Sequence, residues 1–153
     1  RIVPERKKTG KGFHFFHFML DLDQGPCAIK RLRGCGCGNE YAAVDPDGGV
    51  FPCHQFVGQP EWRMGDVLTG EYDLETKARF ARANVYSKDK CRACWAKFYC
   101  SGGCNANNQQ YEGDILHSHT LSCELEKKRL ECAIMIKAAL ADAQAGEQEE
   151  RSH

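Results

Sequence analysis

Four thiols lie within fourteen residues in Cys91-Arg-Ala-Cys94-Trp-Ala-Lys-Phe-Tyr-Cys100-Ser-Gly-Gly-Cys104, the segment that decides how this chain folds. Cys53 lies upstream of it, and Cys123 lies nineteen residues downstream. Two thiols separated by two residues can bind one metal ion from a single turn of chain. Because six or seven thiols are spread over about a hundred residues, we expect two metal centres whose ligands interleave along the sequence.

The composition limits the classes of function. A chain of 153 residues normally forms one domain, and its 21 basic and 21 acidic side chains leave no net charge. Without a basic surface to attract phosphates, nucleic acid is not an expected partner. The longest apolar run, residues 13–20, contains His14 and His17 and is far too short to cross a bilayer, so a membrane is not an expected partner either.

The start of the chain carries no secretory segment. It begins with Arg1 rather than Met, and residues 1–11 are charged and uncapped, which predicts a piece of a longer protein. Ten cysteines are compatible with disulfides, with zinc alone, or with metal clusters. Since Cys-x2-Cys pairs are too close to join distant elements, we expect reduced, metal-binding thiols in a cytoplasmic protein. Cys132 is the exception, because its apolar helical surroundings favour a buried core thiol.

The first half of the chain predicts β structure. Residues 13–22 are aromatic and β-prone, so we expect a strand, with His14 and His17 on opposite faces and therefore no two-histidine site. Residues 41–44 and 50–51 flank the turn Asp45-Pro-Asp-Gly-Gly49 and predict a hairpin. This hairpin returns Cys53 towards the glycine-rich segment Gly34-Cys-Gly-Cys-Gly38, whose backbone can approach a bulky inorganic group closely.

The second half predicts helices. We expect a helix from Leu74 to about Lys88, loops and short turns over residues 91–104, and irregular chain over 105–120. A long helix capped by Ser122 follows, with one face formed by Leu121, Leu125, Cys132, Ile136 and Leu140. Residues 142–153 read as a frayed polar tail. The expected fold class is therefore a small α+β domain with the hairpin first and the long helix last.

The cysteine spacing resembles that of the SPASM domain, the auxiliary-cluster extension of radical S-adenosylmethionine (SAM) enzymes. Cys35 or Cys37, followed by Gly48 and Cys53, matches Cys-x(9 to 15)-Gly-x4-Cys, and the second block matches Cys-x2-Cys-x5-Cys-x3-Cys followed by a distant cysteine. The resemblance covers residues 27–136. It implies two [4Fe-4S] clusters. The first would be bound by Cys53, Cys104 and either Cys35 or Cys37, and the second by Cys91, Cys94, Cys100 and Cys123.

The resemblance is stronger to one subfamily of these enzymes. Phe51-Pro-Cys-His-Gln-Phe-Val-Gly58 and the segments 34–41, 94–104 and 127–137 are similar to those of the maturases of six-cysteines-in-forty-five (ranthipeptide) precursors, which form thioethers in ribosomally made peptides. Among the upstream thiols, the Cys-Gly-x-Gly form favours Cys35 as the first-cluster ligand, with Cys37 as the alternative. Cys27 is the expected fourth ligand, unless that position stays open for the substrate.

The resemblance also implies a mechanism. A 5′-deoxyadenosyl radical made elsewhere takes a hydrogen atom from a carbon of a cysteine-containing precursor peptide. The peptide thiolate bonds to that carbon, and one electron remains for a cluster to accept. This chain would bind the sulfur and collect the electron, since a positioned thiolate must meet the radical before it is quenched.

The radical-generating core is expected outside this sequence. No Cys-x3-Cys-x2-Cys spacing occurs here, so SAM and a third [4Fe-4S] cluster would belong to a core elsewhere in the same chain, and this piece alone should not cleave SAM. We therefore divide the sequence into residues 1–26, the end of a preceding barrel or a linker, residues 27–141, the SPASM domain, and residues 142–153, the tail.

Two other classes of protein stay open. A zinc-binding interaction module would use Cys91, Cys94, Cys100 and Cys104 but would leave Cys53 and the other outlying cysteines without a role. A free-standing iron-sulfur electron carrier fits the long gaps between ligands poorly. Near the thiols, we interpret His54 as a structural, hydrogen-bonding residue and the aromatic side chains as hydrophobic cover, namely Trp95, Phe98 and Tyr99.

Overall fold

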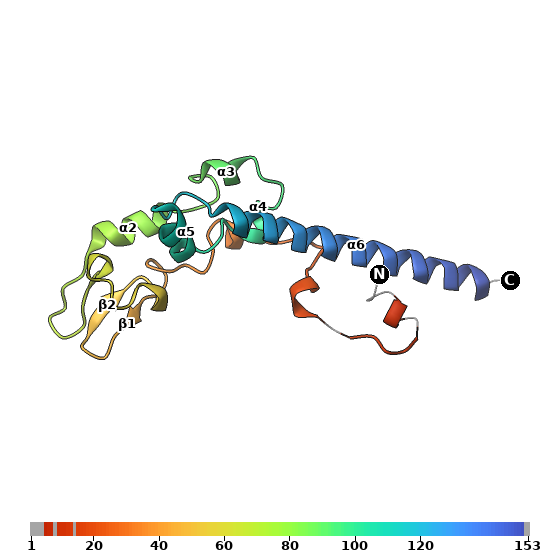
Figure 1. The fold of residues 1–153 in the computed structure, drawn as a ribbon, viewed down its shortest axis with the longest axis horizontal. Helices are drawn as coiled ribbons and strands as arrows, with labels where there is room; N and C mark the ends of the chain where they lie inside the picture. The colour runs from red at the N-terminus through yellow and green to blue at the C-terminus, as the bar shows by residue number, and fades with distance from the viewer. Residues whose placement is uncertain (1–4, 8, 14, 152–153) are drawn as a thin grey trace. The chain divides into compact units, whose positions relative to one another are not determined.

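A computed structural model describes residues 5–7, 9–13 and 15–151 (Figure 1). The chain divides into two compact units. One comprises Pro26–Cys123, and the other comprises Arg1–Gly25 together with Glu124–His153. The structure has the predicted α+β class, with a small antiparallel sheet, several short helices and a long C-terminal helix. In the described residues, no helix combines the length and the apolar character that a membrane span needs.

The sheet confirms the predicted hairpin. Strands β1 (Ala43–Val44) and β2 (Gly49–Phe51) pair antiparallel, with Ala43 opposite Phe51. The Asp45 carboxylate stabilises the turn because its Oδ1 accepts a hydrogen bond of 2.7 Å from the Gly49 N–H. A third strand, β3 (Gly65–Asp66), completes the order β1-β2-β3. Strand β3 was not predicted, because two residues are too short to show an alternating pattern.

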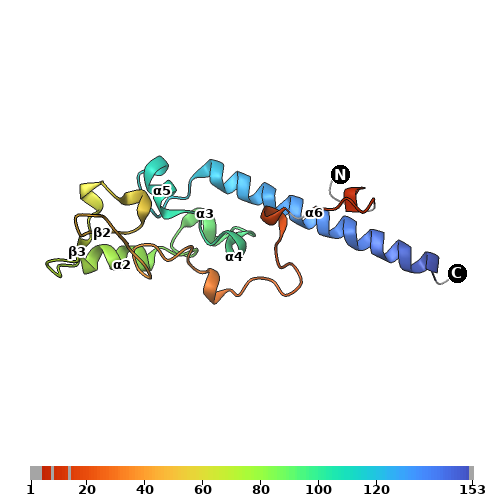
Figure 2. The same ribbon diagram turned by 90° about the horizontal axis from the view of Figure 1, so that it is seen from below.

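Four short α-helices belong to the first unit. They are α2 (Leu74–Arg82), α3 (Asp89–Arg92), α4 (Lys97–Cys100) and α5 (Asn105–Glu112), as Figure 2 shows from a second direction. The short turns in the 91–104 segment were predicted, whereas the irregular chain predicted for residues 105–120 is wrong over α5. Polar asparagines and glutamines gave that helix no apolar period to detect. The described residues also form four 3-10 turns: Phe16–Phe18, Ile29–Arg31, His54–Phe56 and Pro60–Trp62.

Helix α2 begins where the sequence predicts and ends earlier. The side chain of Asp73 accepts hydrogen bonds from the N–H groups of Glu75 and Thr76, which caps the helix. The helix stops at Arg82 rather than near Lys88. A local turn replaces it, because Asn84 Oδ1 accepts a hydrogen bond of 2.8 Å from the Tyr86 N–H.

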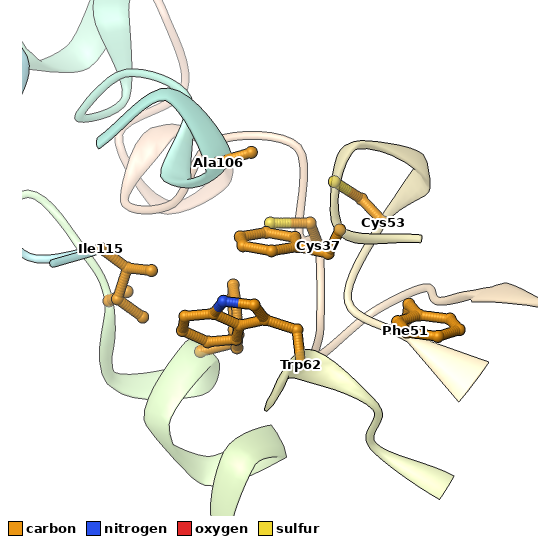
Figure 3. Close-up of a cluster of buried hydrophobic side chains, with 9 residues drawn as sticks. Cys37, Phe51, Cys53, Trp62, Ala106 and Ile115 are labelled. Carbon is orange, nitrogen blue, oxygen red and sulfur yellow. The ribbon is translucent and has the colours of Figure 1, made fainter. Parts of the chain in front are cut away.

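An aromatic cluster forms the core of the first unit. The Phe56 ring lies 4.8 Å from Trp62 and 5.8 Å from Phe80, measured between centroids. Cys37 and Cys53 are buried in the same cluster, and Figure 3 shows both sulfur atoms in the part of the cluster nearest Ala106, with the Trp62 ring on the other side. The segments predicted to bind metal therefore pack directly against the hydrophobic core.

In the second unit, the predicted N-terminal strand is wrong. Residues 16–18 form a 3-10 turn, in which the Phe18 N–H donates to the Phe15 carbonyl at 2.9 Å. The described residues of 13–22 pair with no other strand, and a strand needs such a partner for its backbone groups. The prediction for His14 lies outside the described residues. Arg129 ties this segment to the C-terminal helix, since its Nη1 donates to the His17 carbonyl at 2.9 Å.

The long helix α6 (Thr120–Arg151) confirms the predicted element but not its details. Ser122 lies within its first turn rather than at its cap, and residues 142–151 continue the helix instead of fraying. The predicted apolar face is wrong at its start, because Leu121 and Leu125 are 56% and 63% exposed. Among the residues of α6 whose burial is described, Leu130 and Ala133 are buried, and Cys132 is only partly buried rather than a core thiol.

Candidate metal centre

The structure places Cys35, Cys53, Cys104 and the alternative ligand Cys37 near one another. Cys27, the predicted fourth ligand, is exposed and does not belong to this cluster. Cys37 and Cys53 are each 4% exposed and belong to the buried cluster, against which Cys104 packs. Cys35 interacts electrostatically with both Cys37 and Cys53. The glycine-rich segment and the segment that carries Cys53 are joined by a backbone hydrogen bond. The Gly38 N–H donates at 2.9 Å to the carbonyl of Pro52, the residue before Cys53. The hairpin thus returns Cys53 to the glycine-rich segment, as predicted.

Three polar side chains reach the sulfur atoms of this group. The Tyr41 hydroxyl lies 3.6 Å from Cys35 Sγ, Gln55 Nε2 lies 3.5 Å from Cys104 Sγ, and Asn105 Nδ2 lies 3.7 Å from Cys37 Sγ. Each can donate a hydrogen bond to sulfur. Donors of this kind stabilise thiolate ligands, so these three side chains form a polar shell suited to a bound metal.

Burial makes the thiols of Cys37 and Cys53 hard to ionise without a cation. Desolvation, followed by the negative charges of Cys35 and Cys53, raises the pKa of the Cys37 thiol to about 12. Burial also raises the pKa of Cys53, and Cys104 adds to the effect. Several buried thiolates repel one another, whereas a metal among them supplies positive charge and drives their deprotonation. The group therefore has the chemistry of a metal-binding site.

The thiols predicted for the second centre are less buried. Cys91 Sγ lies 3.1 Å from Ser118 Oγ and is buried, while Cys94, Cys100 and Cys123 are partly exposed. Cys91 and Cys94 lie one turn apart, because the Cys94 N–H donates to the Cys91 carbonyl at 3.0 Å. Throughout the described part of the chain, no three His, Cys, Asp or Glu side chains stand in a ready arrangement for a metal ion. Both ligand sets therefore stay predictions.

The loop between Cys100 and Cys104 connects the two predicted ligand sets. Ser101 has a φ of 59°, and Gly102 and Gly103 have φ of 84° and 74°, so three successive residues lie in the left-handed region. This conformation is costly for Ser101. Its hydroxyl is buried, and no hydrogen-bond partner lies among the described residues. A sulfide-containing cluster would offer an acceptor here, so the unpaired hydroxyl fits such a group.

One residue of this region, Lys88, was not predicted from the sequence. It is 2% exposed, and its Nζ donates to the Gly102 carbonyl and to Asn105 Oδ1, each at 2.8 Å. Burial lowers the pKa of Lys88, and attraction to nearby thiols, with Cys91 first, opposes that shift. The surrounding sequence Ser87-Lys-Asp-Lys90 reads as a polar surface loop, so it held no signal for burial.

The remaining predicted residues differ in exposure. Cys27 and Cys35 are exposed, and His54 is exposed too. Trp95 is 54% exposed, and its predicted role as cover for a cluster stays a prediction. Phe98 is partly buried and, with Tyr86, receives the Lys97 ammonium at 5.5 Å from each ring centroid.

Known proteins with similar sequences include iron-sulfur cluster-binding domains, in agreement with the expectation that the cysteines bind metal. Residues 35–95 match the family model of SPASM, an iron-sulfur cluster-binding domain. The chain is also similar to the PqqA peptide cyclases of Methylorubrum extorquens, strain PA1, with 28% identity, and of Methylorubrum populi, with 27% identity. These alignments extend over 124 residues, which are 77% of this chain and 31% of each relative. The chain therefore spans about a third of the length of the curated relatives that it matches.

Proposed function

We propose that this chain is the auxiliary iron-sulfur part of a radical SAM enzyme that modifies a peptide, and that the modification is a thioether crosslink in a ribosomally made precursor. The observation that carries the proposal is the SPASM match over residues 35–95. This range contains Cys37 and Cys53, which are buried in the core, and Cys35, which interacts electrostatically with both. The relatives named as PqqA peptide cyclases support a peptide as the substrate.

The chain would hold two [4Fe-4S] clusters. We propose Cys53, Cys104 and Cys35 for the first, with Cys37 as the alternative to Cys35 and Cys27 as the fourth ligand. We propose the remaining four thiols for the second, namely Cys91, Cys94, Cys100 and Cys123. The burial of Cys37 and Cys53 and their interaction with Cys35 support the first set. When bound, the clusters would supply an acceptor for one electron and an iron position for a sulfur ligand.

The residues of this chain would prepare that environment. The core formed by Phe56, Trp62 and Phe80 excludes water from one side of the first ligand group. Tyr41 and Gln55 donate towards Cys35 and Cys104, which would orient those thiolates. A substrate cysteine that replaces Cys27 at the first centre would be held as a thiolate, because the positive charge of the metal favours deprotonation of a bound thiol. SAM cleavage would occur in a separate core, because this sequence has no Cys-x3-Cys-x2-Cys.

A second candidate function is a peptide crosslink that does not use sulfur. The word cyclase in the name of the relatives favours it, since that name states ring formation in a peptide and mentions no thioether. The two candidates differ in whether a substrate thiol binds the first centre. A short cysteine-containing model peptide and its serine counterpart separate them: a change in the visible and EPR spectra with the cysteine peptide alone favours the thioether.

The test of the proposal is a metal analysis of protein purified without oxygen. We expect about eight irons and as many acid-labile sulfides per chain. One zinc and no sulfide would overturn the proposal and leave a zinc module. A Cys27→Ala variant, measured alongside, assigns the fourth ligand of the first centre. Retention of all the iron, with a stronger spectral response to the cysteine peptide, is expected if substrate and Cys27 share that position.

A further inference from the structure

Lys88 is a buried cation that forms no ion pair with a carboxylate among the described residues. Both of its hydrogen-bond acceptors are uncharged, the Gly102 carbonyl oxygen and Asn105 Oδ1. No carboxylate in the described part of the chain forms an ion pair with it. Transfer of an unpaired ammonium into a protein interior is costly, so buried lysines are normally paired with an anion.

The anionic groups that can balance this charge are thiolates. Four thiols interact electrostatically with Lys88, and they come from both predicted centres: Cys91 and Cys100 from the second, and Cys37 and Cys104 from the first. Cluster formation deprotonates these ligands. The ammonium therefore lies where negative charge appears when either centre is assembled, and the cost of its burial is offset only in that state.

Lys88 also contacts the loop at residues 100–104, which connects the two predicted centres. Gly102 lies between Cys100 and Cys104, and its φ is 84°. A Cβ at this position would lie 3.4 Å from Lys88 Cδ and 3.5 Å from Lys88 Nζ, so the lysine packs against the bare backbone. The second acceptor, Asn105, reaches Cys37 through its Nδ2. One ammonium thus holds the connecting loop and the first residue of α5.

We propose that Lys88 is a positioning residue shared by the two proposed iron-sulfur centres, where it balances the charge of the thiolate ligands and holds the 100–104 loop between them. This inference rests on the proposed function. A fixed positive charge beside a cluster favours the state that carries one more electron, so Lys88 raises the reduction potentials of both centres. A buried ammonium at this place keeps both centres ready to accept an electron.

The test compares Lys88→Met with Lys90→Met in the anaerobically purified protein. Methionine keeps the length of the side chain and removes the charge. Lys90 is the matched control, because it lies only two residues away, in helix α3, but is exposed and donates to Thr120 Oγ1. We measure iron and sulfide content, thermal unfolding, and the two midpoint potentials by EPR-monitored redox titration. In Lys88→Met, we expect both potentials to fall by at least the equivalent of a tenfold change, about 59 mV for one electron.

Potentials and cluster content equal to those of Lys90→Met would overturn the inference. If Lys88→Met does not fold, Asn105→Asp replaces it, since this change keeps the side-chain size and places a carboxylate against the ammonium. We expect both potentials to fall in Asn105→Asp, because the charge that acts on both centres is neutralised. A fall at one centre only would overturn the shared role, since a carboxylate beside Cys37 would do that by itself.

The outcomes also separate this inference from the proposed function. Wild-type protein without acid-labile sulfide would mean that the proposed function has failed. Wild-type protein with two clusters, together with a Lys88→Met variant that behaves like Lys90→Met, would leave the proposed function intact and reject only the role of Lys88.

Discussion

Asn105 Nδ2 donates a hydrogen bond to Cys37 Sγ at 3.7 Å, across 68 residues of sequence. The oxygen of the same amide accepts from Lys88 Nζ at 2.8 Å, so the two partners together determine the orientation of the amide. The contact joins the first turn of α5 to the glycine-rich segment at residues 34–38. Burial raises the pKa of Cys37, and the hydrogen bond from Asn105 lowers it in part.

The first prediction concerns the pH dependence of stability in the metal-free protein. The pKa of Cys37 rises from 9.0 to about 12 in the folded state, so the unfolded chain loses this proton at lower pH than the native one. Stability that is present below pH 9 is therefore lost as the pH rises towards 12. One thiol contributes a slope of about 1.4 kcal/mol per pH unit to the free energy of unfolding.

Urea unfolding of wild type and Cys37→Ala between pH 8 and 12 checks this slope, because the titrating groups that do not interact with Cys37 contribute equally to both proteins. We expect a shallower loss of stability in Cys37→Ala. Identical slopes in the two proteins would show that Cys37 ionises in the folded state as it does in the unfolded chain.

The second prediction concerns the packing of the glycine-rich segment on the core. Gly38 has a φ of 72°, and a Cβ there would lie 2.5 Å from the Phe80 ring. Gly38→Ala should therefore cost about 1–2 kcal/mol for the backbone and a further ~1–3 kcal/mol for overpacking. Gly58 is the matched control, because its φ is 82° but no atom lies within 4 Å of its Cβ position.

Thermal or urea unfolding of the two alanine variants separates strain from packing. Gly58→Ala should show the backbone cost alone. Equal destabilisation by both substitutions would mean that the segment carrying Cys35 and Cys37 does not rest on Phe80.

The third prediction concerns the division of ligands between the two centres. Cys53→Ala should remove the cluster of the first centre and leave about four irons and four sulfides per chain, held by the second. Cys123→Ala should remove the cluster of the second centre and leave a similar number at the first. The two variants should then differ in their EPR spectra and midpoint potentials, although their iron contents agree.

Iron, sulfide and EPR measurements on both variants provide the check, with Cys132→Ala as the control that should keep all the iron. Loss of all iron from Cys53→Ala, with an unchanged far-UV circular dichroism spectrum, would contradict two independently held centres.

The fourth prediction concerns the start of α2. The hydrogen bonds from Thr76 and Glu75 to the Asp73 carboxylate lower its pKa, so its stabilising effect is present above pH 3.8 and is lost as the pH falls further. Asp73→Ala should cost about 1 kcal/mol at neutral pH, whereas Asp73→Asn keeps an acceptor and should cost less. Thermal unfolding at pH 7 and pH 3 measures both effects, and an equal loss in the two variants would argue against capping.

The sequence by itself determined which thiols are candidates for metal binding. Side-chain identity and spacing were enough for the thiols, because Cys-x2-Cys and the distant Cys53 restrict what a chain of this length can bind. The hairpin at Asp45 and the start of α2 at Asp73 were also predictable. Both depend on hydrogen bonds between neighbours in the sequence, as Asp45 to Gly49 and Asp73 to Thr76 show.

Only the tertiary structure decided which polar groups are buried. Lys88 lies in a sequence typical of a surface loop. Its ammonium donates hydrogen bonds to Gly102 and Asn105, which lie fourteen and seventeen residues away in the sequence. The predicted strand at residues 13–22 and the predicted burial of Leu121 failed for a related reason. Strand pairing and the burial of a helix face depend on partners distant in the sequence, and local periodicity carries no information about where those partners lie.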